Sequence, residues 1–169
     1  VLVLDLDHEP PATPGGVTVL REPAADDSGW FATWLDVVVA AALNPDTQGL
    51  PQHDKFSRTS LELAELAGLD AGVRTYLATV DEVAAGGAGL RLDDGIAQMA
   101  GAGTVPAYRR RGVQTALVAA RLTDARKAGC DLAVVTTQPG SPSHANTQRM
   151  GFDVGYTRAI LVKETDVPG

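Results

Sequence analysis

The chain has 169 residues, a net charge of −7 and a pI of about 4.8, and 44% of its residues are hydrophobic. That length suits one domain with a sizeable core, and an acidic chain without a basic face excludes general nucleic-acid binding. No apolar run reaches the length of a membrane span, and no secretory signal peptide is evident, so we expect a cytoplasmic protein without a membrane partner. The single cysteine excludes an intrachain disulfide, and the three histidines lack metal-ligand spacing, so we expect no metal.

The chain opens on a short apolar segment, Val1–Leu6, which predicts a strand, and a linker rich in proline and glycine follows. We therefore divide the chain into residues 1–16, an N-terminal strand and linker that could be the remnant of a longer N-terminal region, and a single domain over residues 17–169. The first strand could pair with the sheet of that domain or with a neighbouring molecule, which leaves a homodimer open.

From residue 17 onwards, hydrophobic periodicity and turn signals predict alternating strands and helices. Asp93-Asp94-Gly95 is a hairpin signal, so the strands around it form an antiparallel meander. The crossover helix after the meander requires a parallel partner strand. The fold class is therefore α/β, with a mixed, mainly antiparallel sheet and helices on both faces. In chain order, we expect strand 17–21, helix 30–43 capped within 26–28, helix 61–69, strands 73–80, 82–92 and 96–105, helix 114–127, strand 131–137, helix 143–150 capped by Ser143, and strand 156–162.

The stretch from Val105 to Leu117 is the most informative part of the chain. Three successive arginines, Arg109–Arg111, run into Gly112, and an amphipathic helix pattern begins at once. The first turn of a helix presents unpaired N–H groups and the positive end of the helix dipole, and a glycine lets a ligand approach the backbone closely. This order predicts a site for a small anion such as a phosphate group, with a solvated basic turn as the alternative.

These residues resemble the phosphate loop of the GNAT superfamily of acyl-CoA-dependent N-acetyltransferases. In that motif, Gln or Arg is followed after two residues by Gly and, one residue later, by Gly or Ala. Arg109, Gly112 and Gln114 take these three places, so a glutamine replaces the last small residue. The resemblance covers roughly residues 72–163, with a weaker fit back to Val17. It implies the GNAT, or acyl-CoA N-acyltransferase, fold for residues 17–169.

The resemblance implies an N-acetyltransferase that moves an acetyl group from acetyl-CoA to a primary amine by direct attack, the amine belonging to a small molecule or a peptide. Strands 96–105 and 131–137 would part to admit the cofactor. The N–H of Val105 would stabilise the oxyanion, and Thr147 stands where many relatives place a tyrosine that protonates the thiolate. The residues expected to bind acetyl-CoA or CoA are Thr104, Val105, Arg109, Arg110, Arg111, Gly112, Val113, Gln114, Thr115, Ala116 and Asn146.

Two departures from the family pattern concern proton transfer. Gln98 stands near the place where many relatives carry a glutamate base, and threonine replaces the expected tyrosine. Water, Tyr108 or Tyr156 could supply the missing proton. These departures leave a second hypothesis open, a non-catalytic acyl-CoA-binding or regulatory domain on the same fold. A Rossmann-type nucleotide-binding domain is disfavoured because the Gly-x-Gly spacing is missing.

The acceptor pocket would be built by residues 17–70, the least diagnostic segment. His53 lies in a polar loop and could serve as a base, although a solvated loop histidine is the simpler interpretation. Glu62 and Glu65 are interpreted as the solvated face of a helix, with a role at the acceptor site as the alternative. Trp30 and Trp34 are four residues apart on one helix face, which indicates core packing or, alternatively, an aromatic wall of the pocket.

Overall fold

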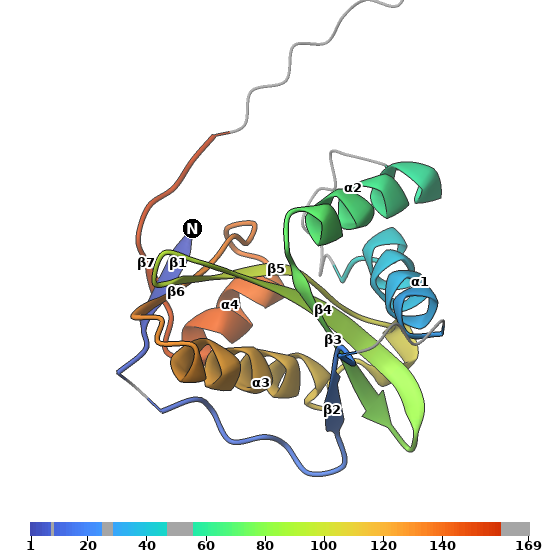
Figure 1. Ribbon diagram of the computed structural model, residues 1–169, viewed down its shortest axis with the longest axis horizontal. Coiled ribbons are helices and arrows are strands. Elements are labelled where there is room, and N and C mark those ends of the chain that lie inside the picture. The colour runs from blue at the N-terminus through green and yellow to red at the C-terminus, as the bar shows by residue number, and fades with distance from the viewer. Residues whose placement is uncertain (8, 25–28, 47–55, 160–169) are drawn as a thin grey trace, which may run out of the picture.

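The computed structural model describes residues 1–7, 9–24, 29–46 and 56–159 (Figure 1). The helices predicted from periodicity and all but the last of the predicted strands are present, with boundaries shifted by a few residues. In chain order the elements are β1 (Leu2–Asp5), β2 (Thr18–Arg21), α1 (Trp30–Leu43), α2 (Arg58–Asp70), β3 (Arg74–Val80), β4 (Val83–Asp93), β5 (Ile96–Thr104), the short 3-10 turn η1 (Pro106–Tyr108), α3 (Val113–Lys127), β6 (Leu132–Val135), α4 (Pro142–Arg149) and β7 (Asp153–Val154).

A single seven-stranded sheet organises the molecule, in the order β2-β3-β4-β5-β6-β1-β7. Among the described strands only the β5–β6 pair is parallel, and α3 is the crossover that connects these two strands. The other neighbouring pairs are antiparallel, including the meander of β3, β4 and β5. The predicted fold class is therefore confirmed, and so is the predicted parallel pairing after the crossover.

The helices cover both faces of the sheet (Figure 1). Side chains alternate along β3, so Tyr76 and Ala78 belong to the core cluster that includes α3, whereas Leu77 belongs to the cluster around α1. The helix α2 packs beside α1. We refer below to the α3 face and the α1 face of the sheet.

Small residues in β4 and β5 let α1 pack close to the sheet. A Cβ atom at Gly87 would lie 2.7 Å from Val38, and one at Gly103 would lie 2.4 Å from Ala41. Trp34 is 1% exposed, and its indole N–H donates to the carbonyl of Ala88 at 3.1 Å. The glycine-rich run in β4 therefore serves close helix packing, and Trp34 belongs to the core.

The N-terminal strand β1 is an integral part of the sheet, between β6 and β7. Leu2 lies opposite Val135 of β6 and Val154 of β7. Leu2, Leu4 and Leu6 all belong to the main core cluster. The sheet and core therefore cross the boundary that the sequence suggested at residue 16.

The predicted last strand, 156–162, is wrong over the residues that can be compared. Residues 156–159 form no strand, and residues 160–162 lie outside the described part of the chain. The strand β1 occupies the edge of β6 that faces away from β5, and the short β7 pairs with β1. Gly155 and Tyr156 still donate to the carbonyl of Val1, and the described residues beyond them have no neighbouring strand.

The cap of one helix also differs from the prediction, and the cap of another cannot be compared. The cap of α4 is Ser141 rather than Ser143: its hydroxyl accepts from the N–H of His144 at 3.1 Å, and Pro142 takes the first helical position, where a missing N–H costs nothing. The cap predicted for α1 within 26–28 lies outside the described residues. Within the described residues, no helix combines the length and apolarity that a membrane crossing requires.

Candidate active site

The site is built where β5 and β6 part. Their parallel ladder runs from Ile96–Leu132 to Met99–Val135, where β6 ends, while β5 continues to Thr104. Beyond Met99, β5 is therefore paired only with β4, and its other edge is open. This is the parting of strands 96–105 and 131–137 that the sequence predicted.

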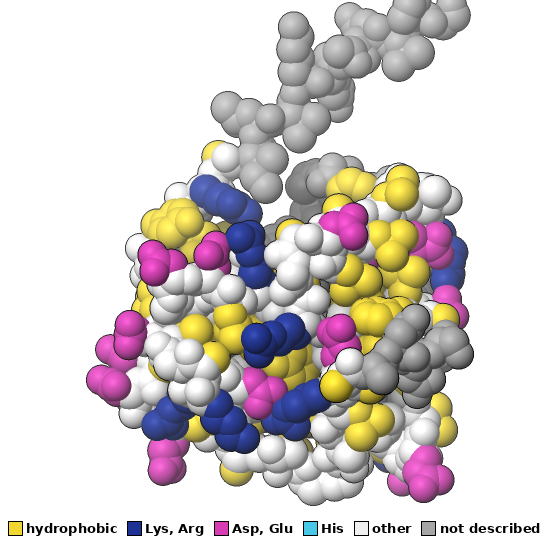
Figure 2. Space-filling model, in the orientation of Figure 1, with side chains coloured by type: hydrophobic (Ala, Val, Ile, Leu, Met, Phe, Trp, Pro, Cys, Tyr) yellow, Lys and Arg dark blue, Asp and Glu magenta, His cyan; other side chains and the backbone are white. Residues whose placement is uncertain are grey.

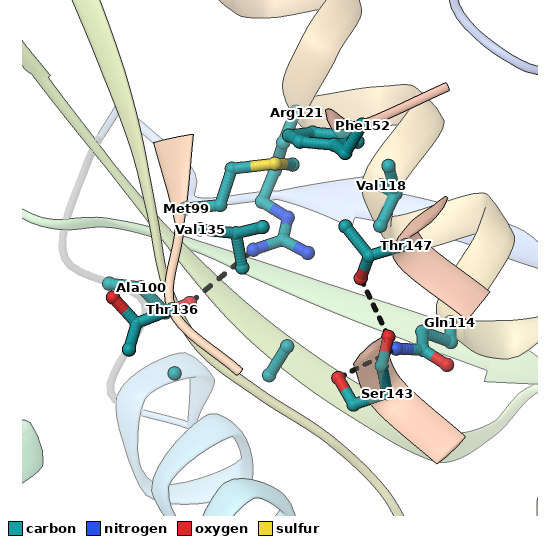
Figure 3. Close-up of a pocket in the computed structure, with 12 residues that line it drawn as sticks. Met99, Ala100, Gln114, Val118, Arg121, Val135, Thr136, Ser143, Thr147 and Phe152 are labelled. Carbon is teal, nitrogen blue, oxygen red and sulfur yellow. Dashed lines mark hydrogen bonds between the residues drawn. The ribbon is translucent and has the colours of Figure 1, made fainter. Parts of the chain in front are cut away.

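Two pockets meet at this opening. The first, of about 140 Å³, lies on the α3 face and is lined by β5, α3 and α4, including Gln114, Arg121 and Thr147 (Figure 3). The second, of about 350 Å³, includes Gln98 and Tyr156. Both pockets share residues 99–101 of β5 and residues 135–136 after the ladder. A molecule held between the parted strands can therefore be reached from both pockets.

A β-bulge in β5 lies at the junction of the pockets. Ala88 pairs with Ala102 and Gly89 pairs with Ala100, so Gly101 is the extra residue. From α3, one terminal nitrogen of Arg121 donates to the carbonyls of Gly89 at 3.1 Å and Ala100 at 3.3 Å. The bulge is thus held from the α3 face by a cationic side chain.

The pairing of β5 with β4 decides which N–H groups face the opening. The N–H of Val105 donates to the carbonyl of Ala85 at 3.0 Å, so it points toward β4. Along an antiparallel strand these directions alternate, which turns the N–H groups of Thr104 and Ala102 toward the open edge. The carbonyl of Thr104 also points away from β4, because it accepts a hydrogen bond from Arg109 at 3.3 Å. The N–H predicted to stabilise the oxyanion, that of Val105, is therefore engaged elsewhere, and Ala102 and Thr104 offer donors in its place.

The loop before α3 has the backbone geometry of an anion site. Arg110 and Gly112 both have positive φ angles, of 61° and 81°, and such turns gather successive N–H groups into a concave surface. The first helical bond of α3 runs from the N–H of Ala116 to the carbonyl of Gly112, and no side chain caps this end. The N–H groups of the first turn, in Val113, Gln114 and Thr115, therefore lack intrahelical acceptors.

Two of the three arginines are engaged within the protein. The Arg109 guanidinium donates to the carbonyls of Thr104 and Asn44, which ties the loop to the end of α1. Arg111 lies 3.2 Å from Asp81 and 5.5 Å from the centre of the Tyr108 ring. On the face shown in Figure 2, basic side chains are interspersed with acidic ones. Backbone N–H groups are therefore the main donors that the loop offers to an anion, because the positive charge of its arginines is partly neutralised by nearby acidic groups.

Gln114, which replaces the small residue of the family motif, bridges α3 and α4. Its amide nitrogen donates to the hydroxyl of Ser143 at 3.3 Å, and its oxygen accepts from Asn146 at 2.7 Å. Arg149 donates in turn to Asn146. Asn146 is thus brought beside the first turn of α3, next to the other residues predicted to bind the cofactor.

Thr147 lies inside the first pocket and is 4% exposed. Its hydroxyl donates to the carbonyl of Ser143 at 2.8 Å, one turn back in α4. The proton that the sequence hypothesis assigned to the thiolate is therefore engaged in this bond. Tyr108 packs under Arg111, whereas Tyr156 lines the second pocket and is 58% exposed.

Glu65 of α2 is turned toward the bulge. A Cβ atom at Gly101 would lie 3.0 Å and 3.1 Å from its two carboxylate oxygens. Burial raises the pKa of this carboxyl above its ordinary value. Glu62, by contrast, pairs with Arg58 at 2.6 Å on the helix surface. Glu62 therefore fits the interpretation as part of the solvated helix face, whereas Glu65 fits the alternative of a place at the acceptor site. His53, the other candidate base, lies outside the described residues.

Arg121 is the residue whose role the sequence concealed. Its whole side chain is only 2% exposed. Burial lowers its pKa to about 10, so it stays protonated at neutral pH. The available signal was an arginine among the apolar positions of α3, where Leu117, Leu122 and Ala125 are also buried.

The remaining reactive groups in the described part of the chain do not form a second site. Burial and the nearby Asp131 raise the pKa of the Cys130 thiol, which does not favour a nucleophile. Among the described residues, no group of three or more His, Cys, Asp or Glu side chains is placed to hold a metal ion.

The comparisons with known proteins agree with this geometry. The family model described as "Acetyltransferase (GNAT) family" matches residues 24–152. The chain therefore belongs to the GNAT acetyltransferase family. A search of curated protein sequences finds no match.

Solved structures of similar fold include a GCN5-related N-acetyltransferase from Kribbella flavida, with 22% identity, a TM-score of 0.57, and coverage of 90% of this chain and 52% of that one. This chain thus spans about half the length of that protein. The aminoglycoside N-acetyltransferase AAC(6')-Iy, solved with CoA, has 19% identity and a TM-score of 0.60, with 88% and 94% covered. The aminoglycoside 6'-N-acetyltransferase AAC(6')-Ih from Acinetobacter baumannii has 21% identity and a TM-score of 0.58, with 89% and 99% covered.

Proposed function

We propose that this chain transfers an acetyl group from acetyl-CoA to a primary amine by direct attack. The observation that carries the proposal is the uncapped first turn of α3 behind Gly112, placed at the mouth of a pocket between parted strands. Backbone N–H groups over 110–115 suit the pyrophosphate, whereas the N–H of Ala116, also expected to bind it, is already donated to the carbonyl of Gly112. The open edge of β5, at Thr104 and Ala102, suits the pantetheine amides as an added strand would.

The chemistry follows from the groups at the bulge. The amine nitrogen attacks the thioester carbonyl carbon, a C–N bond forms, and the C–S bond breaks as the thiolate leaves. We assign the oxyanion to the N–H of Ala102, which faces the opening, in place of Val105. Glu65 accepts the proton from the amine, directly or through a water molecule. The thiolate takes its proton from water or from Tyr156 rather than from Thr147, whose hydroxyl is engaged.

The acceptor is proposed to be a small-molecule or peptide amine in the cytoplasm. Two of the neighbours of similar fold are named as aminoglycoside acetyltransferases, which supports a soluble polyamine as a first probe. The second pocket, with Gln98 and Tyr156 in its lining, offers hydrogen-bonding groups for such a molecule.

Calorimetric titration of CoA tests the cofactor site. Gly112→Ala measures the steric cost, since a Cβ atom there would lie 2.7 Å from Pro14. Gly112→Asp adds a negative charge at the anion site. Losing one charge-assisted hydrogen bond costs about 1.5–3 kcal/mol, so we expect Gly112→Asp to bind CoA at least ~10-fold more weakly than Gly112→Ala. If both variants fold and bind CoA with equal affinity, the CoA phosphates do not bind at this loop.

A non-catalytic acyl-CoA-binding domain is the second candidate. It is favoured by the engaged hydroxyl of Thr147 and by Gln98 in place of a glutamate. Thiol release from acetyl-CoA distinguishes the two functions when a broad amine panel, including aminoglycosides, is offered to the intact chain. Tight acetyl-CoA binding without thiol release above the no-enzyme rate for any amine would favour the second candidate.

A further inference from the structure

A buried cation forms the inner end of the first pocket. The Arg121 side chain is 2% exposed, and its Nε–H donates to the carbonyl of Leu117 at 3.0 Å. One terminal nitrogen reaches the carbonyls of Gly89 and Ala100. None of the ion pairs among the described residues includes Arg121. A buried charge without a counter-ion is costly, so this position favours an anionic partner.

The second terminal nitrogen of Arg121 is directed into the pocket, on the side where Thr147 lies (Figure 3). A guanidinium carries five N–H donors, and the bonds of the described residues use only those on Nε and on one terminal nitrogen. The remaining donors therefore face the cavity. Carboxylates suit this planar fork better than a neutral acceptor does.

The position of Arg121 along α3 indicates which part of a bound molecule would meet it. Gln114, Val118 and Arg121 line one face of the helix, and Gln114 lies in its first turn, at the anion site. Seven residues of helix advance about 10 Å, so Arg121 lies about that far along α3 from the anion site, where it contacts the bulge of β5. If CoA binds as proposed, this end of the pocket receives the acyl group.

We propose that Arg121 recognises a carboxylate at the far end of the acyl group, so that the preferred donor is the CoA thioester of a short dicarboxylic acid and acetyl-CoA is a poorer one. This inference rests on the proposed function. The pocket volume of about 140 Å³ is comparable to an engineered cavity that holds benzene, which leaves room for a short chain. Met99, Val118 and Phe152 supply apolar walls for its methylene groups.

The donor, rather than the amine, is the source of this carboxylate because the two sides of the opening differ. Arg121 reaches the pocket from α3, whereas Glu65 approaches the bulge from α2, on the α1 face. An amine activated by Glu65 approaches from that second side. A carboxylate on the amine would meet Gln98 and Tyr156 in the second pocket before it could reach Arg121.

Two stable CoA thioethers test the inference without an acceptor. S-(3-carboxypropyl)-CoA and S-butyl-CoA carry equal numbers of acyl-side carbons and differ only in the terminal carboxylate. By calorimetry on the intact chain, we expect the carboxylate form to bind about tenfold tighter or more. If CoA itself fails to bind, the proposed function fails. If CoA binds and the two thioethers bind equally, only the role of Arg121 is overturned.

Matched variants assign the preference to this side chain. Arg121→Gln should bring the affinity ratio of the two thioethers close to one while S-butyl-CoA still binds, and Arg121→Lys should keep part of the ratio. A role in holding the bulge alone would weaken both thioethers equally. Because Arg121→Gln could unfold the bulge, Thr147→Asp provides a second route: a protein carboxylate in the pocket should abolish the preference. A ratio that survives in a folded Arg121→Gln or Thr147→Asp protein overturns the proposal.

Discussion

The two faces of the sheet prepare the same opening in different ways. On the α3 face, donors are fixed in advance: the bare first turn of α3, the Gln114 bridge to α4 and the Arg121 clamp on the bulge. On the α1 face, the titratable carboxylate of Glu65 approaches the bulge, and none of the described residues donates a hydrogen bond to it. Binding of a thioester and transfer of a proton are therefore separable by mutation.

Removing the base should give the largest effect. We expect Glu65→Gln to lower kcat for acetyl transfer by about 10²- to 10⁴-fold, the usual contribution of a positioned general base, while calorimetric CoA affinity stays unchanged. Glu62→Gln is the control, because Glu62 pairs with Arg58 on the helix surface. Equal rates for both variants would mean that the α1 face holds no base at Glu65.

The pH profile sharpens the same test. Glu65 must be ionised to accept a proton, and burial raises its pKa. The acidic limb of kcat/KM should therefore lie above the ordinary glutamate value of about 4.3, with activity rising as pH rises through it. In Glu65→Gln this limb should disappear. A limb that persists unchanged in that variant belongs to another group.

The next largest effect concerns the strand that supports the opening. Leu2 and Leu4 are 1% and 7% exposed in β1, beside β6. Truncating a buried leucine to alanine costs about 2–5 kcal/mol, so Leu2→Ala and Leu4→Ala should lower the urea midpoint with an unchanged m-value. Leu20→Ala on β2, where the side chain is 44% exposed, is the control and should cost less than about 1 kcal/mol. If the two β1 variants unfold at the same urea concentration as the unmodified protein, β1 does not contribute to the stability of the sheet.

Local features of the fold were predictable from sequence, and non-local ones were not. The helix α1 was predicted to the residue because fourteen residues of apolar periodicity define it, and Asp94-Gly95 fixes a hairpin through two positive φ angles. The position of β1 depends on pairing with Val135 and Val154, far away in the sequence. The same apolar pattern fits an outer strand equally well, so composition could not place it.

The candidate site divides in the same way. The Gly112 loop is contiguous in sequence, and its turn and helix start could be predicted together. Which N–H groups of β5 face the opening depends on the pairing with β4. The N–H of Val105 donates to Ala85 of β4, so the prediction that it faces the opening was wrong by one residue along the strand. Glu62 and Glu65 look alike in the sequence, and only the contact of α2 with Gly101 separates them.

The smallest expected effect tests how much the α3 face depends on side-chain charge. Arg111 is 48% exposed and lies 3.2 Å from Asp81; exposed pairs contribute about 0.2–1 kcal/mol and are screened by salt. Arg111→Ala should therefore weaken CoA only a few-fold, with the loss shrinking as salt rises. Asp81→Asn, which keeps a residue tolerant of the positive φ at this turn, should strengthen CoA slightly by releasing Arg111. If Arg111→Ala instead weakened CoA as much as Gly112→Asp does, charge rather than the backbone turn would carry the anion site. The contrast between a preformed face and a titratable face would then no longer hold.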